Sequence, residues 1–162
     1  RSVRGGSWKE DAENAACAFR SGLEGFKAEN TLGFRLVCRQ QGKPFTGSYN
    51  KDTGAGQVGS VKFTMKKIDA VTNGTIGHSD QAAAPTKNPP HKVNLSSYYL
   101  GETEVTQELY EAVMGNNPSF FQGSGKPPVT GEVQAQRPVE EVSWYDAIAF
   151  CNELTKKNNA RR

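Results

Sequence analysis

Two segments near the end of the chain repeat apolar residues at helical spacing. In the first, "TQELYEAVMG", one face carries four apolar side chains: Leu109, Tyr110, Val113 and Met114. Thr106 suits the N-cap, because its hydroxyl can accept from an unpaired backbone N–H, and Gly115 provides the stop. Val105 and Tyr110 stand at the positions of a hydrophobic staple. The pattern predicts a short amphipathic helix that packs through this face.

The second segment, "SWYDAIAFCNELTKK", begins with the same kind of signal. Ser143 is the expected N-cap, and Asp146 three residues later places a carboxylate at the positive end of the helix. Residues at i, i+3, i+4, i+7 and i+10 are apolar: Trp144, Ala147, Ile148, Cys151 and Leu154. We predict that this stripe is buried, with Trp144, Ile148 and Leu154 in a core and Cys151 an inert core thiol.

Alternation of apolar and polar residues predicts strands elsewhere. The segments "VKFTMKKIDA" (residues 61–70) and "HKVNLSSYYLGETEV" (residues 91–105) are typical of half-buried strands. Two further stretches near the start, residues 2–8 and 31–38, resemble a strand pair. Residues 79–90 between the later strands and residues 116–142 between the helices are rich in Pro, Gly and polar side chains. We expect them to be loops, and long ordered loops often carry binding function.

Composition supports a loop-rich α+β protein. The chain has 162 residues, of which 17 are Gly and 8 are Pro, and 35% are hydrophobic, enough to bury a core. Its net charge of +3 is spread along the chain, so we expect no nucleic-acid partner. No apolar run approaches the roughly 18 residues that a membrane span requires. We therefore expect no membrane span in this stretch.

The chain divides by composition into three zones: residues 1–41, 42–60 and 61–162. The middle zone, "GKPFTGSYNKDTGAGQVGS", has no apolar periodicity, which predicts a flexible Gly-rich linker. It contains "GAGQVGS", which has the form G-x-G-x-x-G. This stretch does not stand between a hydrophobic strand and a helix, so we interpret it as linker and not as a dinucleotide site.

Several spaced motifs resemble one known family. The segments "HKVNLSSYYLGETEVTQELYEAVMGNNPSFF" and "RPVEEVSWYDAIAFCNEL" are similar to the N-terminal half of the formylglycine-generating-enzyme, or sulfatase-modifying-factor, family. "RGGSW", Arg20 and "GFRLV" resemble the C-terminal end of that family. The resemblance implies an irregular, loop-rich C-type-lectin-like fold, in agreement with the two helices and short strands that the pattern predicts.

The order of these motifs is reversed relative to the family. Two explanations stay open: a tandem fragment that carries the tail of one domain and the head of the next, or a circularly permuted single domain. The family's middle portion has no counterpart in the sequence, which favours the tandem fragment. We then expect residues 1–41 to be the C-terminal segment of one copy and residues 61–162 the N-terminal segment of a second, so that the fold is incomplete and could pair as a swapped dimer.

The chemistry of the family does not carry over residue by residue. The resemblance implies a C-x4-C pair of copper(I)-binding cysteines after the "GGSW" motif, but Glu10 and Ala15 stand at those positions. Cys17 lies two residues further on and lacks a partner, so we expect a small buried thiol. Only His78 and His91 are available for acid–base or metal chemistry, and no Cys and His cluster has zinc-site spacing. We therefore expect no cofactor, no metal and no catalytic residue.

Polar and aromatic residues between the first two predicted strands are better candidates for ligand binding, because the resemblance implies that this region faces a ligand and is the diversified region of lectin-like variable proteins. The candidate residues are Trp8, Lys9, Glu10, Asp11, Asn14, Phe26 and Asn30. We predict a non-catalytic recognition or structural module of a bacterial multidomain protein, in the cell envelope or outside the cell, with an unknown protein, peptide or glycan ligand. The alternatives are part of an oxidase whose active half lies outside this chain, and a lectin-like variable ligand-display protein.

Overall fold

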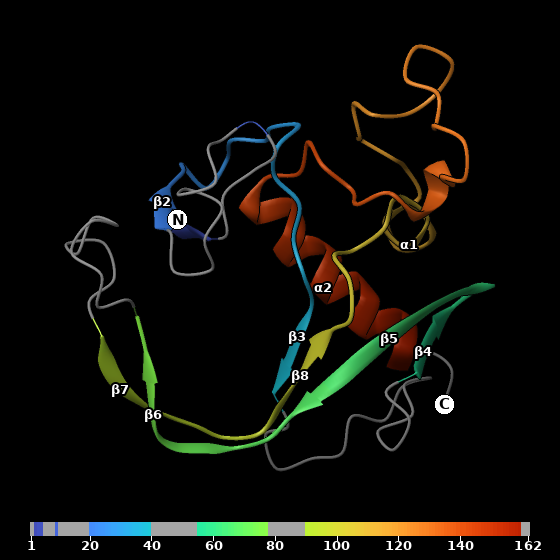
Figure 1. Cartoon of the computed structure of the whole chain (residues 1–162). Helices are drawn as coiled ribbons and strands as arrows, with labels where there is room; N and C mark the ends of the chain where they lie inside the picture. The colour runs from blue at the N-terminus through green and yellow to red at the C-terminus, as the bar shows by residue number, and fades with distance from the viewer. Residues whose placement is uncertain (1, 5–8, 10–19, 40–54, 78–89, 160–162) are drawn as a thin grey trace.

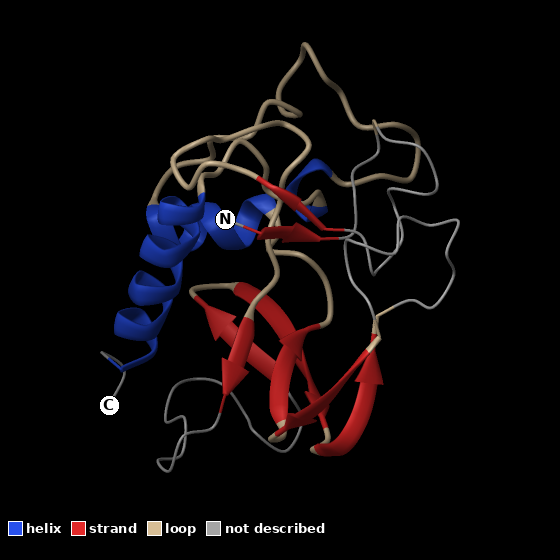
Figure 2. Ribbon diagram, turned by 90° about the vertical axis from the view of Figure 1, so that its left-hand side faces the viewer, coloured by secondary structure: helices blue, strands red, loops and turns tan. Residues whose placement is uncertain are grey.

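The computed structural model describes residues 2–4, 9, 20–39, 55–77 and 90–159. Its strands are short: β1 (Ser2–Arg4), β2 (Arg20–Gly22), β3 (Val37–Arg39), β4 (Ala55–Val58), β5 (Val61–Ile68), β6 (Val71–Ile76), β7 (His91–Leu95) and β8 (Tyr98–Gly101). The helices are α1 (Gln107–Met114), a 3-10 turn η1 (Gln134–Gln136) and α2 (Trp144–Asn159). Figures 1 and 2 show both α-helices on one side of the strands.

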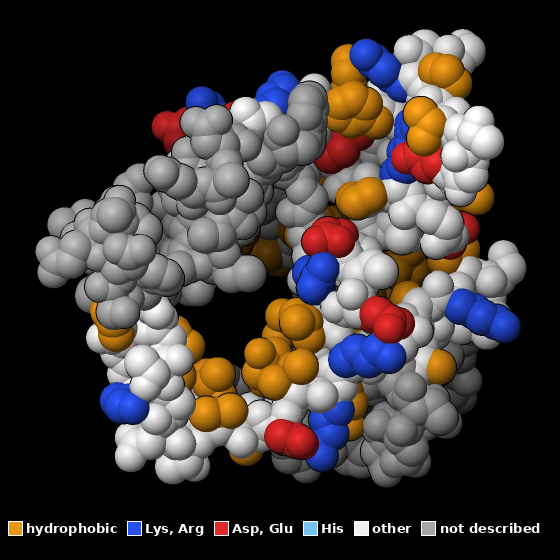
Figure 3. All heavy atoms as spheres, in the orientation of Figure 1, with side chains coloured by type: hydrophobic (Ala, Val, Ile, Leu, Met, Phe, Trp, Pro, Cys, Tyr) orange, Lys and Arg blue, Asp and Glu red, His pale blue; other side chains and the backbone are white. Residues whose placement is uncertain are grey.

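The central sheet is antiparallel with the strand order β3-β8-β5-β4. Beyond Ile68 and Tyr98 the β5–β8 pair continues, after a bend, into the β6–β7 hairpin, where Val71 pairs with Leu95. Apolar side chains gather along the inner side of this bend in Figure 3. Val71, the first residue of β6, is 40% exposed. The strands predicted over residues 61–70 and 91–105 are therefore confirmed, with the second divided at residues 96–97.

Both helix starts have the predicted caps. The Thr106 side chain accepts from Leu109 N, and Gly115 ends α1 with a left-handed backbone, φ 83°. At α2, Asp146 N donates to Ser143 Oγ at 3.2 Å, and Ser143 N donates to Asp146 Oδ2 at 2.9 Å. This reciprocal pair satisfies two donors that would otherwise have no partner at the start of the helix.

The core lies between the helices and the sheet. Its buried side chains come from both helices, the strands and the segments between them: Leu36, Val58, Met65, Val105, Leu109, Tyr110, Val113, Val139, Val142, Phe150 and Leu154. At its centre the Phe150 ring stacks on Tyr110, with 5.4 Å between centroids, and meets Phe34 edge-on at 5.3 Å. The Val105–Tyr110 staple is buried, as the sequence predicts.

The buried stripe predicted on α2 is wrong in part. Leu154 is buried, but Trp144 is 41% exposed, Ile148 is 39% exposed and Cys151 is exposed. Phe150 is fully buried in their place. Adjacent residues differ by about 100° around a helix axis, so burial of the large Phe150 ring turns its neighbour Cys151 toward the surface.

The predicted strand pair near the start is also corrected. β1 pairs with β2, and β3 pairs with β8 of the later zone. Residues 32–36 are not a strand, but they enter the core: Val105 N donates to Phe34 O at 2.9 Å, and Gly101 N donates to Leu36 O at 2.8 Å. The first zone thus shares a core and a sheet with the third.

The flexible linker predicted over residues 42–60 does not reach residue 60. Ala55–Val58 forms β4, which pairs with β5 around a turn at Gly59, where φ is 59°. Val58 is buried and Gly56 lies against the Phe63 ring, where a Cβ would meet ring atoms at 2.2 Å. The G-x-G-x-x-G stretch therefore serves a tight hairpin in its described part, and residues 42–54 lie outside the described residues.

Candidate functional site

Three of the seven predicted ligand-binding residues lie in the described part of the chain: Lys9, Phe26 and Asn30. The structure brings two of them together, because Lys9 Nζ donates to Asn30 Oδ1 at 3.3 Å. Phe26, in the turn before Asn30, is 70% exposed. The other four, Trp8, Glu10, Asp11 and Asn14, lie outside the described residues.

The loop that carries Phe26 and Asn30 is held against the segment before α2. Glu141 N donates to Glu29 O at 3.1 Å, with Glu141 in a left-handed conformation, φ 58°. Gly33 lies so close to the same segment that a Cβ there would stand 3.0 Å from Val139 O. The predicted ligand-binding loop and residues 138–143 therefore form one continuous surface.

Glu140 joins a third segment to this surface. Its Oε1 accepts from Phe121 N at 2.9 Å, and its own N–H donates to Ser119 Oγ at 3.3 Å. Glu140 is 6% exposed, and its Oε2 is buried with no hydrogen-bond partner. Burying a carboxylate oxygen without a hydrogen-bond partner costs free energy. The other oxygen accepts from the backbone of the loop at residues 119–121, so Glu140 links this loop to the segment before α2.

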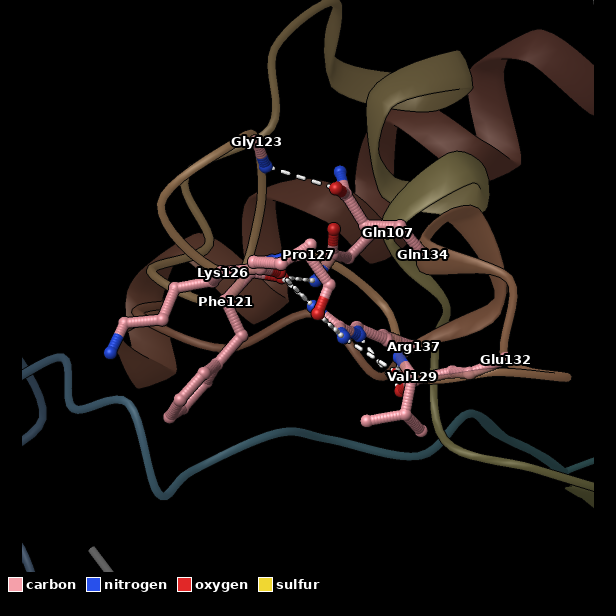
Figure 4. Close-up of polar contacts among 9 residues, drawn as sticks. All are labelled: Gln107, Phe121, Gly123, Lys126, Pro127, Val129, Glu132, Gln134 and Arg137. Atoms are coloured by element: carbon pink, nitrogen blue, oxygen red, sulfur yellow. Dashed lines mark hydrogen bonds and ion pairs between the residues drawn. The ribbon is translucent and has the colours of Figure 1, made fainter.

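Arg137 organises the long loop between the helices (Figure 4). Its guanidinium pairs with both carboxylate oxygens of Glu132, Nε to Oε1 at 2.8 Å and Nη2 to Oε2 at 2.6 Å. It also donates to three backbone carbonyls, those of Phe121, Lys126 and Pro127. The two bonds from Arg137 to the Glu132 carboxylate, with a further bond from Val129 N, lower the pKa of Glu132 to about 2. One side chain thereby ties together a loop that the sequence shows only as irregular.

Further bonds fix the same loop at both ends. Gly123 N donates to Gln134 Oε1 at 2.9 Å, as Figure 4 shows, and Gln136 donates to Glu108 of α1. Buried Gln107 donates to Phe121 O at 3.2 Å and accepts from Asn117 at 3.0 Å. Hydrogen bonds therefore hold the loop at several points along its length, although it contains little regular structure.

Exposed aromatic rings stand on this loop and at the start of α2. Phe120 is 49% exposed and meets Phe121 edge-on, and the Lys126 ammonium lies 4.9 Å from the Phe120 ring centroid. Trp144 and Tyr145, 41% and 55% exposed, form a second edge-on pair. We call Phe26, Phe120, Trp144 and Tyr145, with the segments that hold them, the aromatic surface. Large exposed rings of this kind are typical of binding surfaces.

Sequence reasoning missed most of the aromatic surface. It selected Phe26, but it assigned Trp144 to a core and singled out no residue of the loop at residues 116–142. The doubled aromatic residues in "SFF" and "SWY", each next to a turn or a helix cap, are the signal that could have pointed to them.

The described residues contain no group of three or more His, Cys, Asp or Glu side chains that could hold a metal ion. His91 is exposed at the start of β7, and His78 lies outside the described residues. The two positions that the family's copper pair would occupy hold Glu10 and Ala15, and a carboxylate and a methyl group do not fit a copper(I) ion. No helix within the described ranges is long and apolar enough to cross a membrane.

Comparisons with known proteins agree on the kind of fold. Residues 57–158 match the family described as sulfatase-modifying factor enzyme 1-like domain. Chaperone protein LppX of Paenibacillus barcinonensis is 45% identical over 69 residues, which cover 43% of this chain and 21% of LppX. The solved structure of Treponema denticola variable protein 1 is 58% identical with a TM-score of 0.58, over 65% of this chain and 35% of that one. The chain thus spans about a fifth to a third of the length of these relatives, and its fold is the α+β, C-type-lectin-like one that its motifs imply.

Proposed function

Because the chain belongs to the sulfatase-modifying factor enzyme 1-like domain family, we propose that it is a non-catalytic recognition module of that family that binds its ligand on the aromatic surface. The observation that carries the proposal is the combination of exposed rings with a hydrogen-bonded support. Phe26, Phe120 and Tyr145 are 70%, 49% and 55% exposed. The loop below Phe120 is nevertheless held by Glu140 and Arg137, and the Phe26 loop by the bond from Glu141 N to Glu29 O. Preorganised aromatic side chains bind with a small loss of conformational entropy.

The chemistry of the surface supports a polar ligand with apolar faces, such as a glycan or a peptide. Aromatic rings supply area for stacking, and Lys9, Asn30 and Glu29 supply donors and acceptors at its edge. Glycan and peptide ligands both combine hydrogen-bonding groups with C–H surfaces, and rings such as Trp and Tyr suit both.

The similarity to a variable protein favours a second, more specific form of the same function. Treponema denticola variable protein 1 is 58% identical over 65% of this chain. On this alternative the loop around Phe26 and Asn30 is a display segment whose side chains differ between relatives while Glu29, Gly33 and the underlying Val139 keep their roles. This alternative is supported by the structure of the loop: its side chains are exposed, whereas its backbone contacts residues 138–141.

Binding to immobilised glycans and peptides tests the proposal. The full chain is screened first, and the ligands found are then measured with Phe26→Ala, Phe120→Ala and Tyr145→Ala. Each substitution is expected to weaken binding by about tenfold, or roughly 1.4 kcal/mol, as for an interface aromatic of moderate importance. Val71→Ala, an exposed apolar residue on the β6–β7 hairpin, is the matched control and should leave binding unchanged. Equal effects at Val71 and the aromatic positions would contradict the proposed surface.

Catalysis is tested separately by incubating the chain with copper(I) and a cysteine-containing sulfatase peptide and following aldehyde formation by mass. We expect no product, because Glu10 and Ala15 provide no thiolate. If product forms with the unaltered chain and not with Cys17→Ser, the chain is an oxidase and the proposal of a non-catalytic module is wrong.

A further inference from the structure

A small pocket between α2 and the sheet gathers most of the sulfur atoms of the chain. It has a volume of about 110 Å³ and is lined by residues of α2, β3, β5 and the segment just before β3. Of the eight described residues that line it, three carry sulfur: Cys38 of β3, Met65 of β5 and Cys151 of α2. The whole chain has three Cys and two Met. Three segments far apart in the sequence thus bring three soft donor atoms to one cavity.

The rest of the lining offers nothing to a charged or strongly polar ligand. Four of the other residues are Leu36, Val37, Phe63 and Leu154, and the fifth, Thr155, donates its hydroxyl to Cys151 O at 2.8 Å. The described residues that line the pocket include no carboxylate, imidazole or ammonium group. A hard cation such as Mg²⁺ needs oxygen ligands and would find none, whereas thiol and thioether sulfur binds soft cations.

A disulfide between the two thiols does not explain their position. No Cα atom of β3 lies within 8 Å of a Cα atom of α2. A disulfide requires Cα atoms closer than about 7 Å, so Cys38 and Cys151 cannot join without movement of the backbone. Desolvation by neighbouring side chains raises the pKa of both thiols, so both stay protonated at neutral pH, although Cys151 is exposed on part of its surface.

We propose that this pocket is a binding site for one soft, thiophilic monovalent cation, held by a thiolate of Cys38 or Cys151 with the other sulfur atoms of the pocket. Binding replaces a proton: the S–H bond breaks, a sulfur–metal bond forms, and one H⁺ leaves to solvent with no change of oxidation state. One thiolate and one monovalent cation make a neutral pair, which the apolar lining tolerates better than a net charge. The site is separate from the aromatic surface and does not depend on the proposed function.

Ag⁺ alone, in competition with a chromophoric chelator, tests the site in the full chain. We expect one Ag⁺ per chain. Cys38→Ser and Cys151→Ser should each weaken binding by at least about a hundredfold. Loss of a residue that only contacts a metal ligand costs up to about a hundredfold, so a larger loss indicates a direct ligand. Met65→Leu keeps the volume and removes the thioether, so it should weaken binding by a smaller factor. Met114→Leu, which changes the other Met and leaves the pocket intact, is the matched control.

A second measurement needs no variant and so does not depend on folding of the cysteine mutants. The unaltered chain is alkylated with N-ethylmaleimide with and without one equivalent of Ag⁺, and the three cysteine peptides are quantified by mass. We expect Ag⁺ to protect Cys38 and Cys151 and not Cys17. Protection of Cys17 instead, equal binding by Cys38→Ser and the unaltered chain, or equal loss in Met65→Leu and Met114→Leu would each overturn the proposal.

Discussion

Helices α1 and α2 begin with the same kind of N-cap, but their predicted apolar faces differ in burial. Both begin with a hydroxyl N-cap, Thr106 and Ser143, and both caps form as the sequence predicts. The predicted apolar face of α1 is buried at Leu109, Tyr110 and Val113, whereas that of α2 is exposed at Trp144 and Ile148. The difference teaches that capping is decided within four residues of chain, while burial of a face depends on what the rest of the fold places opposite it.

The width of the apolar stripe explains why α2 was harder to predict. Helix α1 has only eight residues, so it offers few alternative apolar faces. Helix α2 carries apolar residues at 144, 147, 148, 150, 151 and 154, which span more of its circumference than one core contact can cover. Phe34 and Tyr110 supply aromatic partners for Phe150, so the helix turns that residue inward.

The largest expected effect is that loss of Phe150 destabilises the protein more than loss of Trp144, the reverse of what the stripe predicted from the sequence implies. Phe150→Ala should lower the free energy of unfolding by about 3–5 kcal/mol, because it empties a fully buried site between Phe34 and Tyr110. Trp144→Ala should cost no more than about 1.5 kcal/mol, because Trp144 is 41% exposed. Urea unfolding of both variants followed by circular dichroism measures the difference. A larger loss for Trp144→Ala would restore the stripe predicted from the sequence.

The two N-caps should respond alike, although the faces of the helices do not. Thr106→Ala and Ser143→Ala are each expected to cost about 1 kcal/mol, since each leaves a backbone donor of the first turn without its partner. The corresponding Thr106→Ser change keeps the hydroxyl and serves as control, with a loss of a few tenths of a kcal/mol at most. Unequal costs for the two Ala variants, by more than about 1 kcal/mol, would show that capping here depends on tertiary contacts after all.

A smaller effect is expected on the exposed face of α2. Ile148→Thr should change the free energy of unfolding by less than about 1 kcal/mol, because Ile148 is 39% exposed. The equivalent change in α1, Val113→Thr, buries a hydroxyl at a position that is 3% exposed and should cost about 1–3 kcal/mol. Thermal unfolding of the pair gives the comparison directly, and equal losses would mean that the Ile148 face is covered in solution.

The smallest expected effect is confined to the loop that joins the two helices. The pKa of Glu132 is lowered to about 2 from its ordinary 4.5, so the stability that its carboxylate adds is complete above pH 4.5 and is lost as the pH falls through about 2. Amide hydrogen exchange at residues 121–137 should therefore accelerate over this range, relative to α1. In Glu132→Gln the loop amides should exchange faster at pH 5 than in the unaltered chain. Lowering the pH further should then accelerate exchange in the variant less than in the unaltered chain. Unchanged protection in that variant would mean that Arg137 holds the loop through backbone carbonyls alone.

The first and third zones give a further contrast between local and tertiary information. The motif order led us to expect that they belong to different copies of the fold. In the structure the Phe34 and Leu36 carbonyls accept from Val105 N and Gly101 N, and both side chains pack against the core formed with the helices. The assignment of the zones to one copy or two stays a prediction, and the flanking sequence of the gene would test it.

The sequence by itself determined the two helices with their caps, the strands around Phe63 and Tyr99, the irregular loop between the helices and the family, because caps, alternation and spaced motifs are local properties of the chain. Only the tertiary structure decided which face of α2 is buried, that Ala55–Val58 is a strand, that the loop around Asn30 rests on Glu141, and that Cys38, Met65 and Cys151 line one pocket. Each of these depends on contacts between residues far apart in the chain, and the free energy of such contacts is fixed by packing partners that no local pattern reveals.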